Sequence, residues 1–560
     1  MFFISNYFLN TSIMNKDVSK PFQRFWALLK PDSRDIRDIY LFAIVGGILS
    51  LGLPLGIQAI INFVQAGKVS TSWFLLVGLV VLAIGFSGFM NIAQLRITEN
   101  LQQRIFSRSA LEFATRMPAI QLKELLLRYA PEWTNRFFDT LTIQKGISKL
   151  LIDFTAASLQ ILFGLILLSF YHPFFIIFGF ALLLLLLFIF RLTAKRGFVS
   201  SLEESKYKYK VANWLEEIAR NRITFKFLGQ KDILLNRTDS YLQGYLKARE
   251  THFKVLVQQY KYLIGFKVLI ALALLIIGGL LVLTQQMNIG QFVAAEIIIV
   301  LVLNSVEKLI VSLEVVYDVL TAIEKIGEVT DLSLESNEGL ELDQQQTKFG
   351  VSFQNVCYQT SWSNQLLFEG LNLDFEAGKK YLLLDPEGHR SQSIFLLISA
   401  ITEPISGSVL IEGIPTTNLK VDQLRNRMAT CLKQDQIIYG SVMDNLTMGR
   451  AISTQEVIEL SEKLGLAPLI LNLPDGYQSI LNPEAGALNR TMVALILIIR
   501  ALLSKPALLL WDTHYQYLTQ EQQAVVFAYL DQHADCTVIL SATTDALKDK
   551  TTAVYSLSQL

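Results

Sequence analysis

Six apolar runs dominate the first part of the chain. Each is about 20 residues long, the length that an α-helix needs to cross the hydrocarbon core of a bilayer. The runs lie near residues 41–64, 73–93, 151–170, 173–190, 263–284 and 291–313. Several contain glycine or proline, as at Gly46, Pro54 and Gly85, and these residues are more frequent in membrane helices than in soluble ones. The pattern predicts six transmembrane helices.

Lysine and arginine are distributed unevenly among the segments that join these runs. The segment before the first run and the long segments 94–150 and 194–262 are rich in both, whereas the three short connections contain Lys68 alone. Because basic residues favour the cytoplasmic side, we expect an integral protein of the inner (plasma) membrane with both termini in the cytoplasm. The long segments are helical in pattern, so we expect the helices to continue into the cytoplasm and to turn near 118–132 and 216–228.

The pattern changes after residue 349. Short apolar stretches typical of strands alternate with helical stretches, which predicts an α/β domain. The expected strands are Val351–Cys357, Lys380–Leu384, Ser408–Ile411, Ala507–Trp511 and Thr537–Ser541. We therefore divide the chain into a cytoplasmic N-terminal segment (1–38), a six-span transmembrane domain (39–330), a polar linker (331–349) and the α/β domain (350–560).

The composition supports a membrane protein. Hydrophobic residues make up 52% of the chain and charged residues 18%, which excludes a disordered chain or an ordinary soluble enzyme. The 49 basic and 49 acidic residues give zero net charge, so we expect no nucleic-acid partner. The three cysteines lie far apart and predict neither a metal site nor disulfides. The apolar start, 1–14, lacks a basic region, so we expect no signal peptide, with Met1 or Met14 as the first residue.

The segment Asp385–Ser393 has the position of a phosphate-binding loop. It follows the expected strand Tyr381–Leu384 and precedes an apolar helix. Such a loop needs glycines, so that backbone N–H groups can wrap the phosphates, and a lysine that reaches the β- and γ-phosphates. This segment contains Gly388 but no lysine, and Asp385 and Glu387 add negative charge.

The whole chain resembles an ABC exporter half-transporter. The six spans with long cytoplasmic extensions carry the resemblance, together with the segments Gly378–Lys380, Glu403–Gly413, Leu473–Tyr477 and Arg500–Leu503. The segment Leu53–Ile60 is similar to exporters of the type I secretion and bacteriocin group, and we expect no peptidase domain before it. The resemblance implies a multi-domain fold, in which an all-α six-helix transmembrane domain precedes an α/β P-loop-type ATPase-like domain.

The resemblance also implies a degenerate nucleotide-binding domain. It aligns Arg390 with a glycine of the P-loop, Ser391 with the lysine and Gln392 with the Mg²⁺-binding hydroxyl. It aligns Thr513 with the general-base glutamate and Ala542 with the switch histidine. The candidate site residues are Asp385, Gly388, Arg390, Ser391, Gln392 and Ser393 in the loop, and Leu488, Asn489, Arg490, Thr491 and Met492 at the signature motif. We therefore expect negligible ATP hydrolysis, with ATP and Mg²⁺ as doubtful cofactors.

Other motif positions leave alternatives open. Asp512 follows an apolar strand and is either a Mg²⁺ ligand or a cap at the strand end. The position of the family's Q-loop glutamine aligns with Gln434, or with Lys433 if the alignment has no gap. The adenine-stacking aromatic aligns near Thr360, with Tyr358 as a substitute.

Basic residues near these motifs also have two readings. His389, Arg390 and Arg490 form either an alternative anion site or ordinary solvated positions on loops. His514 lies two residues from Asp512, which suggests catalysis, although a surface-loop histidine is the commoner case.

Polar residues interrupt the sixth apolar run. Glu296, Asn304 and Glu307 lie within or near it, and an acidic side chain in a span is a functional candidate by default. They line a cavity, or they serve helix packing and reach to the interface. Lys267, at the cytoplasmic start of the fifth run, is expected to anchor at the interface.

Two functions from different classes follow from the resemblance. The first is a membrane transport protein that forms the pathway as a homodimer, or as a heterodimer with an exporter homologue, with a membrane-fusion protein as a candidate partner. The second is a non-transporting scaffold or regulatory subunit of an envelope complex that keeps the exporter fold. The sequence does not identify a cargo.

Overall fold

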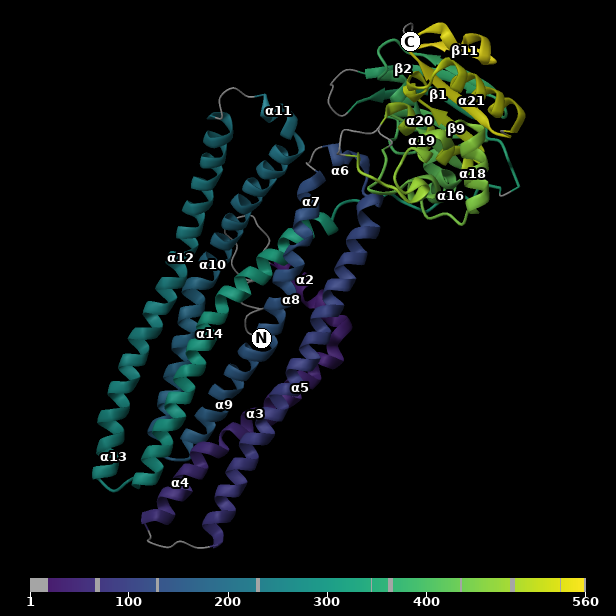
Figure 1. Cartoon of the computed structure of the whole chain (residues 1–560). Coiled ribbons are helices and arrows are strands. Elements are labelled where there is room, and N and C mark those ends of the chain that lie inside the picture. Colours follow the sequence, from purple (N-terminus) through teal and green to yellow (C-terminus); the bar gives the residue numbers. More distant parts are fainter. Residues whose placement is uncertain are drawn as a thin grey trace. The chain divides into compact units, whose positions relative to one another are not determined.

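The computed structural model describes residues 19–65, 71–126, 130–227, 232–343, 345–360, 366–433, 436–483, 489–533 and 535–557. The chain forms two compact units (Figure 1). The first comprises Met1–Pro118 and Tyr129–Leu332, and the second comprises Ala119–Arg128 and Ser333–Leu560. The short helix α6 (Leu122–Leu126) thus belongs to the second unit, although in the sequence it falls between helices of the first unit.

The first unit is helical. Its helices are α2 (Ser19–Leu29), α3 (Ser33–Ser50), α4 (Gly52–Gln65), α5 (Thr71–Arg116), α7 (Ala130–Phe137), α8 (Asp139–Lys149), α9 (Thr155–Ser169), α10 (Phe174–Arg220), α11 (Arg222–Lys226), α12 (Asp232–Ala273), α13 (Gly279–Leu283) and α14 (Ile289–Thr330). Six helical segments of the described residues are long and apolar enough to cross a membrane. This result confirms the six spans predicted from the apolar runs.

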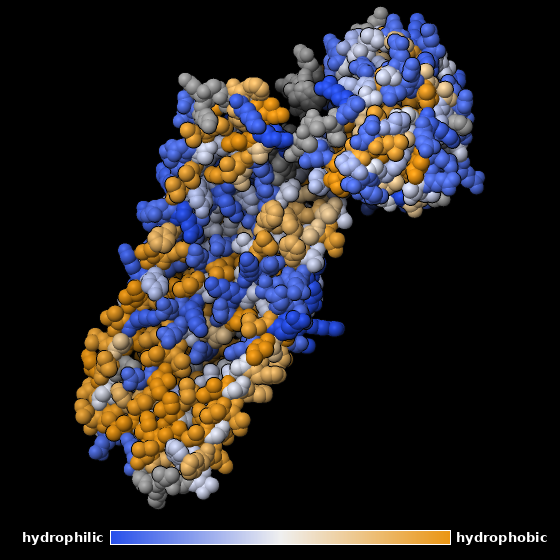
Figure 2. Space-filling view, viewed as in Figure 1, coloured by the Kyte–Doolittle hydropathy of each residue, from blue (hydrophilic) through white to orange (hydrophobic). Residues whose placement is uncertain are grey.

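The long helices continue well beyond their apolar runs. Helix α10 has 47 residues and α14 has 42, which at 1.5 Å per residue corresponds to about 60–70 Å, against a hydrocarbon core of about 30 Å. Figure 2 shows hydrophobic side chains gathered around one end of this unit, and hydrophilic side chains become frequent toward the other end. The helices therefore extend past the membrane, as their sequence pattern predicts.

Helix α14 packs at the centre of the helical unit. It lies against α4, α8, α9 and α10, and residues such as Ala294, Ile298 and Val302 are fully or almost fully buried. Close approach depends on glycine, since a Cβ atom added at Gly164 of α9 would lie 2.6 Å from Cγ2 of Val302. The helix with the polar positions of the sixth run is thus held by packing along most of its length.

The second unit is an α/β domain with two main sheets. The antiparallel sheet has the order β2-β1-β4-β5, the parallel sheet has the order β11-β3-β10-β9-β6, and β7 pairs with β8. The strands are β1 (Val351–Gln359), β2 (Leu366–Phe375), β3 (Lys380–Leu384), β4 (Ser406–Ile411), β5 (Ile414–Pro415), β6 (Met428–Cys431), β7 (Gly440–Ser441), β8 (Ile480–Leu481), β9 (Leu508–Trp511), β10 (Thr537–Ala542) and β11 (Ala553–Ser556).

Helices cover the parallel sheet and complete the domain. They are α15 (Arg390–Ile398), α16 (Val421–Asn426), α17 (Val442–Thr447), α18 (Thr454–Lys463), α19 (Ala467–Leu471), α20 (Arg490–Leu503) and α21 (Gln520–His533). Every residue of β9 and β10 is buried, as expected for inner strands of a parallel sheet that is covered on both faces. The transmembrane helices followed by an α/β domain confirm the predicted fold class.

Candidate functional site

The altered motif positions meet at the carboxyl edge of the parallel sheet. In the strand register, Leu384 of β3 pairs with Ala542 of β10, and Trp511 of β9 pairs with Leu540. Asp385 and Asp512 directly follow β3 and β9. Parallel order thus brings Asp385, Asp512 and Ala542 to one edge, where open α/β sheets bind ligands.

The loop between β3 and α15 turns at Gly388. This residue has φ = +74°, and a Cβ atom added there would meet nothing within 4 Å. The backbone conformation, and not a lack of space, therefore requires glycine. After this turn, α15 begins at Arg390, and the N–H of Ser391 donates to Asp385, the residue that follows β3.

The Asp385 carboxylate caps the first turn of α15. It is only 2% exposed, and its Oδ2 accepts hydrogen bonds from the backbone N–H of Ser391 (2.8 Å) and from the Ser391 hydroxyl (3.0 Å). Ser391 is fully buried, and its Oγ accepts from the Ser541 hydroxyl at 2.8 Å. Sequence reasoning missed this cluster, although an aspartate six residues before a serine at a helix start was a signal for it.

The other loop residues point their polar groups elsewhere. Arg390 donates from Nη1 to the carbonyl oxygen of Leu557, and the Ser393 hydroxyl donates to the carbonyl of His389 at 3.0 Å. The Nδ1 atom of His389 lies 3.5 Å from Oε2 of Glu387. Gln392 is half-buried.

The start of α20 is also capped by its own residues. Asn489 accepts from the N–H of Thr491 at 2.9 Å, and the Thr491 hydroxyl donates to the Tyr517 carbonyl at 2.7 Å. The Arg490 guanidinium stacks over the Tyr517 ring at 5.4 Å, and Met492 is buried. His389, Arg390 and Arg490 thus have separate partners. Leu488 lies outside the described residues.

The remaining nucleotide-motif positions are partly described. Asp512 is 1% exposed, and its N–H donates to the Cys431 carbonyl at 3.1 Å. Thr513 begins the turn of 3₁₀-helix Thr513–Tyr517, which contains His514, and Ala542 ends β10 with no exposed surface. In the part of the chain that the structure describes, no cluster of three His, Cys, Asp or Glu side chains is arranged to hold a metal ion.

The residues considered for adenine stacking are buried, and the Q-loop position is described in part. Tyr358 is 8% exposed and packs against Phe368 with ring centroids 6.5 Å apart, so it belongs to the core. Thr360 is also buried, at 6%. Gln434 lies outside the described residues, whereas the neighbouring Lys433 is exposed.

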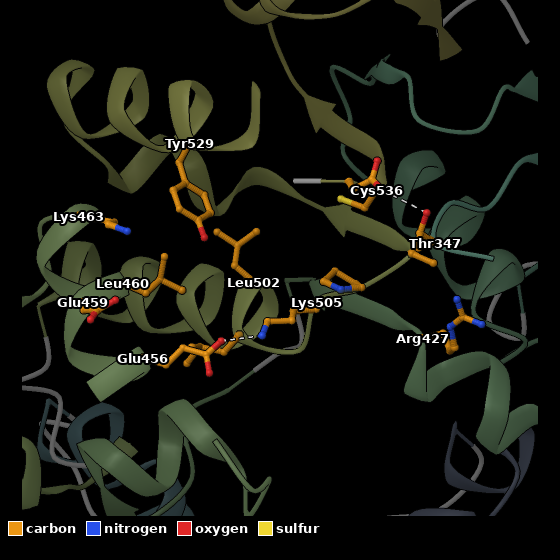
Figure 3. A pocket seen from close by; sticks show the side chains of 14 residues that line it. Thr347, Arg427, Glu456, Glu459, Leu460, Lys463, Leu502, Lys505, Tyr529 and Cys536 are labelled. Atoms are coloured by element: carbon orange, nitrogen blue, oxygen red, sulfur yellow. Dashed lines mark hydrogen bonds and ion pairs between the residues drawn. The ribbon is translucent and has the colours of Figure 1, made fainter. Parts of the chain in front are cut away.

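A cavity of about 500 Å³ occurs elsewhere in the second unit (Figure 3). Ala507 and Cys536, which line it, precede β9 and β10, so the cavity lies at the amino ends of these strands. An ion pair of 2.8 Å joins Lys505 to Glu456 inside it, as Figure 3 shows. The cavity is therefore distinct from the edge that carries the nucleotide motifs.

The polar residues of α14 have different surroundings. Glu296 and Asn304 are exposed in the isolated chain, as are Val300 and Lys308. Exposed residues thus recur every four positions and form a stripe along the helix. Glu307 instead pairs with Lys267 of α12 and accepts a hydrogen bond of 2.9 Å from Tyr260. Lys267 thus joins two helices.

Comparisons with known proteins match both units. Residues 39–306 match the family model for the ABC transporter transmembrane region, and residues 368–514 match that for the ABC transporter. A solved bacterial Atm1-family ABC exporter with ATP bound has a TM-score of 0.79 and 17% identity, with 95% of this chain and 94% of that chain covered. This likeness concerns the fold.

Curated relatives are similar over part of their length. The alpha-hemolysin translocation ATP-binding protein HlyB of Escherichia coli is 24% identical over 325 residues, which cover 57% of this chain and 45% of that protein. The uncharacterized ABC transporter ATP-binding protein YknU of Bacillus subtilis is 29% identical over 250 residues, 43% of this chain and 41% of that protein. The chain spans less than half the length of these relatives.

Proposed function

We propose that this chain is an ABC exporter half-transporter, which forms half of a transmembrane pathway in a dimer and hydrolyses ATP negligibly. The two matched regions and the shared fold support this proposal. Transport is inferred from the architecture, while the impaired hydrolysis is inferred from the residues at the carboxyl edge of the parallel sheet. The membrane location that we propose is the inner (plasma) membrane, with both termini in the cytoplasm.

The observation that carries the proposal is the state of the loop before α15. Ser391 stands where the resemblance expects a lysine, and it is buried and bonded to Asp385. A charge-assisted hydrogen bond contributes about 1.5–3 kcal/mol, so the loss of the lysine contact weakens nucleotide binding about 10- to 100-fold. The residues present therefore do not fit Mg-ATP.

Residues for the hydrolysis step are also altered. Thr513 stands at the position of the general base, and a threonine hydroxyl does not accept a proton from water at neutral pH. Ala542 replaces the switch histidine with a methyl group. The absence of a general base lowers the rate by a factor of about 10²–10⁴. Weak binding and slow chemistry act on different steps, so their effects combine.

Dimerisation does not restore a complete site. The resemblance implies that each ATP lies between the P-loop of one subunit and the signature motif of the other. In a homodimer, both composite sites carry altered residues on both sides. With an intact homologue, one site contains this chain's P-loop, and the other contains Asn489–Met492 in place of a glycine signature.

A scaffold or regulatory role is the second candidate, and the capped loop is the observation that favours it. Because Asp385 accepts the hydrogen bond of the Ser391 N–H in the first turn of α15, this donor has a partner without nucleotide. Such a domain suits a subunit that holds partners in an envelope complex, as well as one whose homologous partner supplies the hydrolysis.

ATP turnover by the purified protein in lipid nanodiscs tests the proposal. We expect the wild-type protein and Asp512→Asn to release phosphate from Mg-ATP at the same background rate. We also expect Thr513→Glu to leave that rate unchanged, because the P-loop remains altered. A wild-type turnover that Asp512→Asn abolishes would overturn the proposal, since a contaminating ATPase does not respond to this substitution.

A further inference from the structure

We propose that the Asp385 carboxylate occupies the phosphate position of the P-loop as an internal anion, so that the loop is complete without nucleotide and excludes it. This inference rests on the proposed function and deepens it. The missing lysine alone predicts a weak nucleotide site, whereas an internal anion predicts a site that is already filled.

The geometry of the first turn of α15 supports the inference. The N-terminus of a helix attracts an anion, because its first N–H groups lack partners within the helix and the helix dipole is positive there. Here the Ser391 N–H donates to Asp385 Oδ2 at 2.8 Å, and the Ser391 hydroxyl donates to the same oxygen at 3.0 Å. A single carboxylate oxygen thus takes two donors of the residue that aligns with the P-loop lysine.

The backbone of Asp385 and the hydroxyl of its partner Ser391 are both bonded to β10. The backbone N–H of Asp385 donates to the Ala542 carbonyl at 2.8 Å, which fixes the residue to the end of β10. The Ser541 hydroxyl, one residue earlier, donates to Ser391 Oγ at 2.8 Å and so orients the Ser391 hydroxyl toward Asp385. Asp385 and Ser541 are 2% and 0% exposed. The arrangement is therefore a built, desolvated cluster and not a solvated side chain on a loop.

A nucleotide phosphate would have to displace this carboxylate. It would take over the Ser391 donors and leave Asp385 as a second negative charge beside the phosphate, buried and without its hydrogen bonds. The phosphate and the Asp385 carboxylate would repel each other, and burial of a carboxylate without hydrogen bonds is unfavourable. The neighbouring basic residues offer no compensation, since Arg390 donates to Leu557 and His389 lies beside Glu387.

An ordinary helix cap predicts something different. If Asp385 only caps α15, its removal lowers stability and leaves anion binding unchanged. If it is an internal anion, its removal also opens a phosphate site. The lysine substitution Ser391→Lys separates the readings further, because a lysine introduced beside Asp385 pairs with that carboxylate and gains nothing for nucleotide until Asp385 is removed.

The experiment measures binding of inorganic pyrophosphate and of Mg-ATP to the full-length protein in nanodiscs by calorimetry. The variants are Asp385→Gly, Ser391→Lys, and both together. Glu387→Gly is the matched control, because it removes the same charge from the same loop, while the Glu387 side chain is 70% exposed and lies beside His389. We expect no binding at millimolar ligand for the wild type, Glu387→Gly and Ser391→Lys, and pyrophosphate binding for Asp385→Gly. For the double variant we expect binding of both ligands at least tenfold tighter than that of Ser391→Lys.

Two results would overturn the inference. One is wild-type binding as tight as that of the double variant. The other is a folded double variant that binds neither ligand better than Ser391→Lys does. If Asp385→Gly variants fail to fold, Asp385→Asn replaces them, and pyrophosphate binding no better than that of Glu387→Gln then rejects the inference. Asp512-dependent ATP turnover by the wild type would reject the proposed function and the inference with it, whereas a folded double variant without improved binding rejects the inference alone, so the two failures are distinguishable.

Discussion

At the scale of single residues, burial determines the chemistry of the three cysteine thiols. Cys431 is fully buried, Cys536 is 4% exposed, and Cys357 is partly accessible. Burial raises the pKa of the Cys536 thiol from its usual 9.0 to about 11, although the positive charge of Lys380 opposes this shift. Because the thiolate is the nucleophile, Cys536 is unreactive near neutral pH even though it lines the cavity of Figure 3.

This burial leads to a prediction about alkylation. In the native protein at pH 8, iodoacetamide should label Cys357 and leave Cys431 and Cys536 unlabelled, as peptide mass spectrometry would report. Labelling of all three after denaturation is the control. Folding favours the protonated Cys536 thiol, because the folded state raises its pKa. The resulting contribution to the free energy of unfolding is fully present below about pH 9 and is lost as the pH rises toward 11. Rapid native labelling of Cys536 would contradict the burial.

The loop before α15 shows what the sequence reveals at this scale. The alternation of apolar and helical stretches located the loop. The resemblance aligned Ser391 with the P-loop lysine and Ala542 with the switch histidine. The hydrogen bonds from Ser391 to Asp385 and from Ser541 to Ser391 were not predictable in the same way. They depend on the register of β3 and β10, which lie far apart in the sequence.

At the scale of helices, close contacts through glycine set the packing in the helical unit. A Cβ atom added at Gly146 of α8 would lie 2.2 Å from Cγ2 of Val319, and one added at Gly164 of α9 would lie 2.6 Å from Cγ2 of Val302. Both contacts join the neighbouring helix to α14. A side chain at either glycine therefore forces the helices apart.

Substitution of these glycines tests the packing. We expect Gly164→Ala to destabilise the protein by about 1–3 kcal/mol, the usual effect of overpacking, and Gly164→Ala with Val302→Ala to recover part of the loss. Gly85→Ala in α5 is the matched control, since its added Cβ atom would meet nothing within 4 Å. Thermal unfolding in detergent measures the effect. Equal melting temperatures for Gly164→Ala and Gly85→Ala would reject the predicted clash.

The contact between α12 and α14 gives a second prediction at this scale. Lys267 and Glu307 form an ion pair, with side chains 30% and 31% exposed. Replacing either residue by its neutral counterpart, Lys267→Gln or Glu307→Gln, leaves the other charge unpaired near the membrane. We expect each to cost about 1–3 kcal/mol, and the double variant to cost less than the sum. Additive effects in thermal unfolding would show that the pair does not couple these helices.

The helices and strands were largely predictable, because long apolar runs and short buried strands leave strong patterns. The contacts between them were not. The sequence marked Glu307 as a candidate for a cavity and Lys267 as an interfacial anchor, since each is a charge near an apolar run. Only the packing of α12 against α14 brings the two together. Similarly, no local pattern assigns α6 to the second unit.

At the scale of the whole molecule, the six spans supply half of the helices of the proposed exporter pathway. The exposed stripe on α14, which includes Glu296, Asn304 and Lys308, adds a reason for dimerisation, because polar side chains within a span are unfavourable against lipid. A second subunit or a water-filled pathway covers such a stripe.

We therefore expect the protein to purify as a homodimer or with a homologous subunit. Native mass spectrometry from nanodiscs measures the mass of the assembly directly, and co-expression with a homologous exporter subunit distinguishes the two pairings. A stable monomer that remains monodisperse at all protein concentrations would contradict the prediction.

The exposed stripe also predicts where water enters the assembled protein. Cysteines introduced as Glu296→Cys and Asn304→Cys, in a background that lacks the three native cysteines, should react with a membrane-impermeant polar thiol reagent. Leu82→Cys in α5 is the control, because Leu82 is 75% exposed in an apolar run and should face lipid. Lipid-soluble maleimides should then show the reverse order of labelling. With Glu296 in a wet pathway, the local charge favours polar or cationic cargo over anionic cargo. Positions 296 and 304 that react only with the lipid-soluble reagent would place the stripe against the bilayer and remove the basis for a pathway along α14.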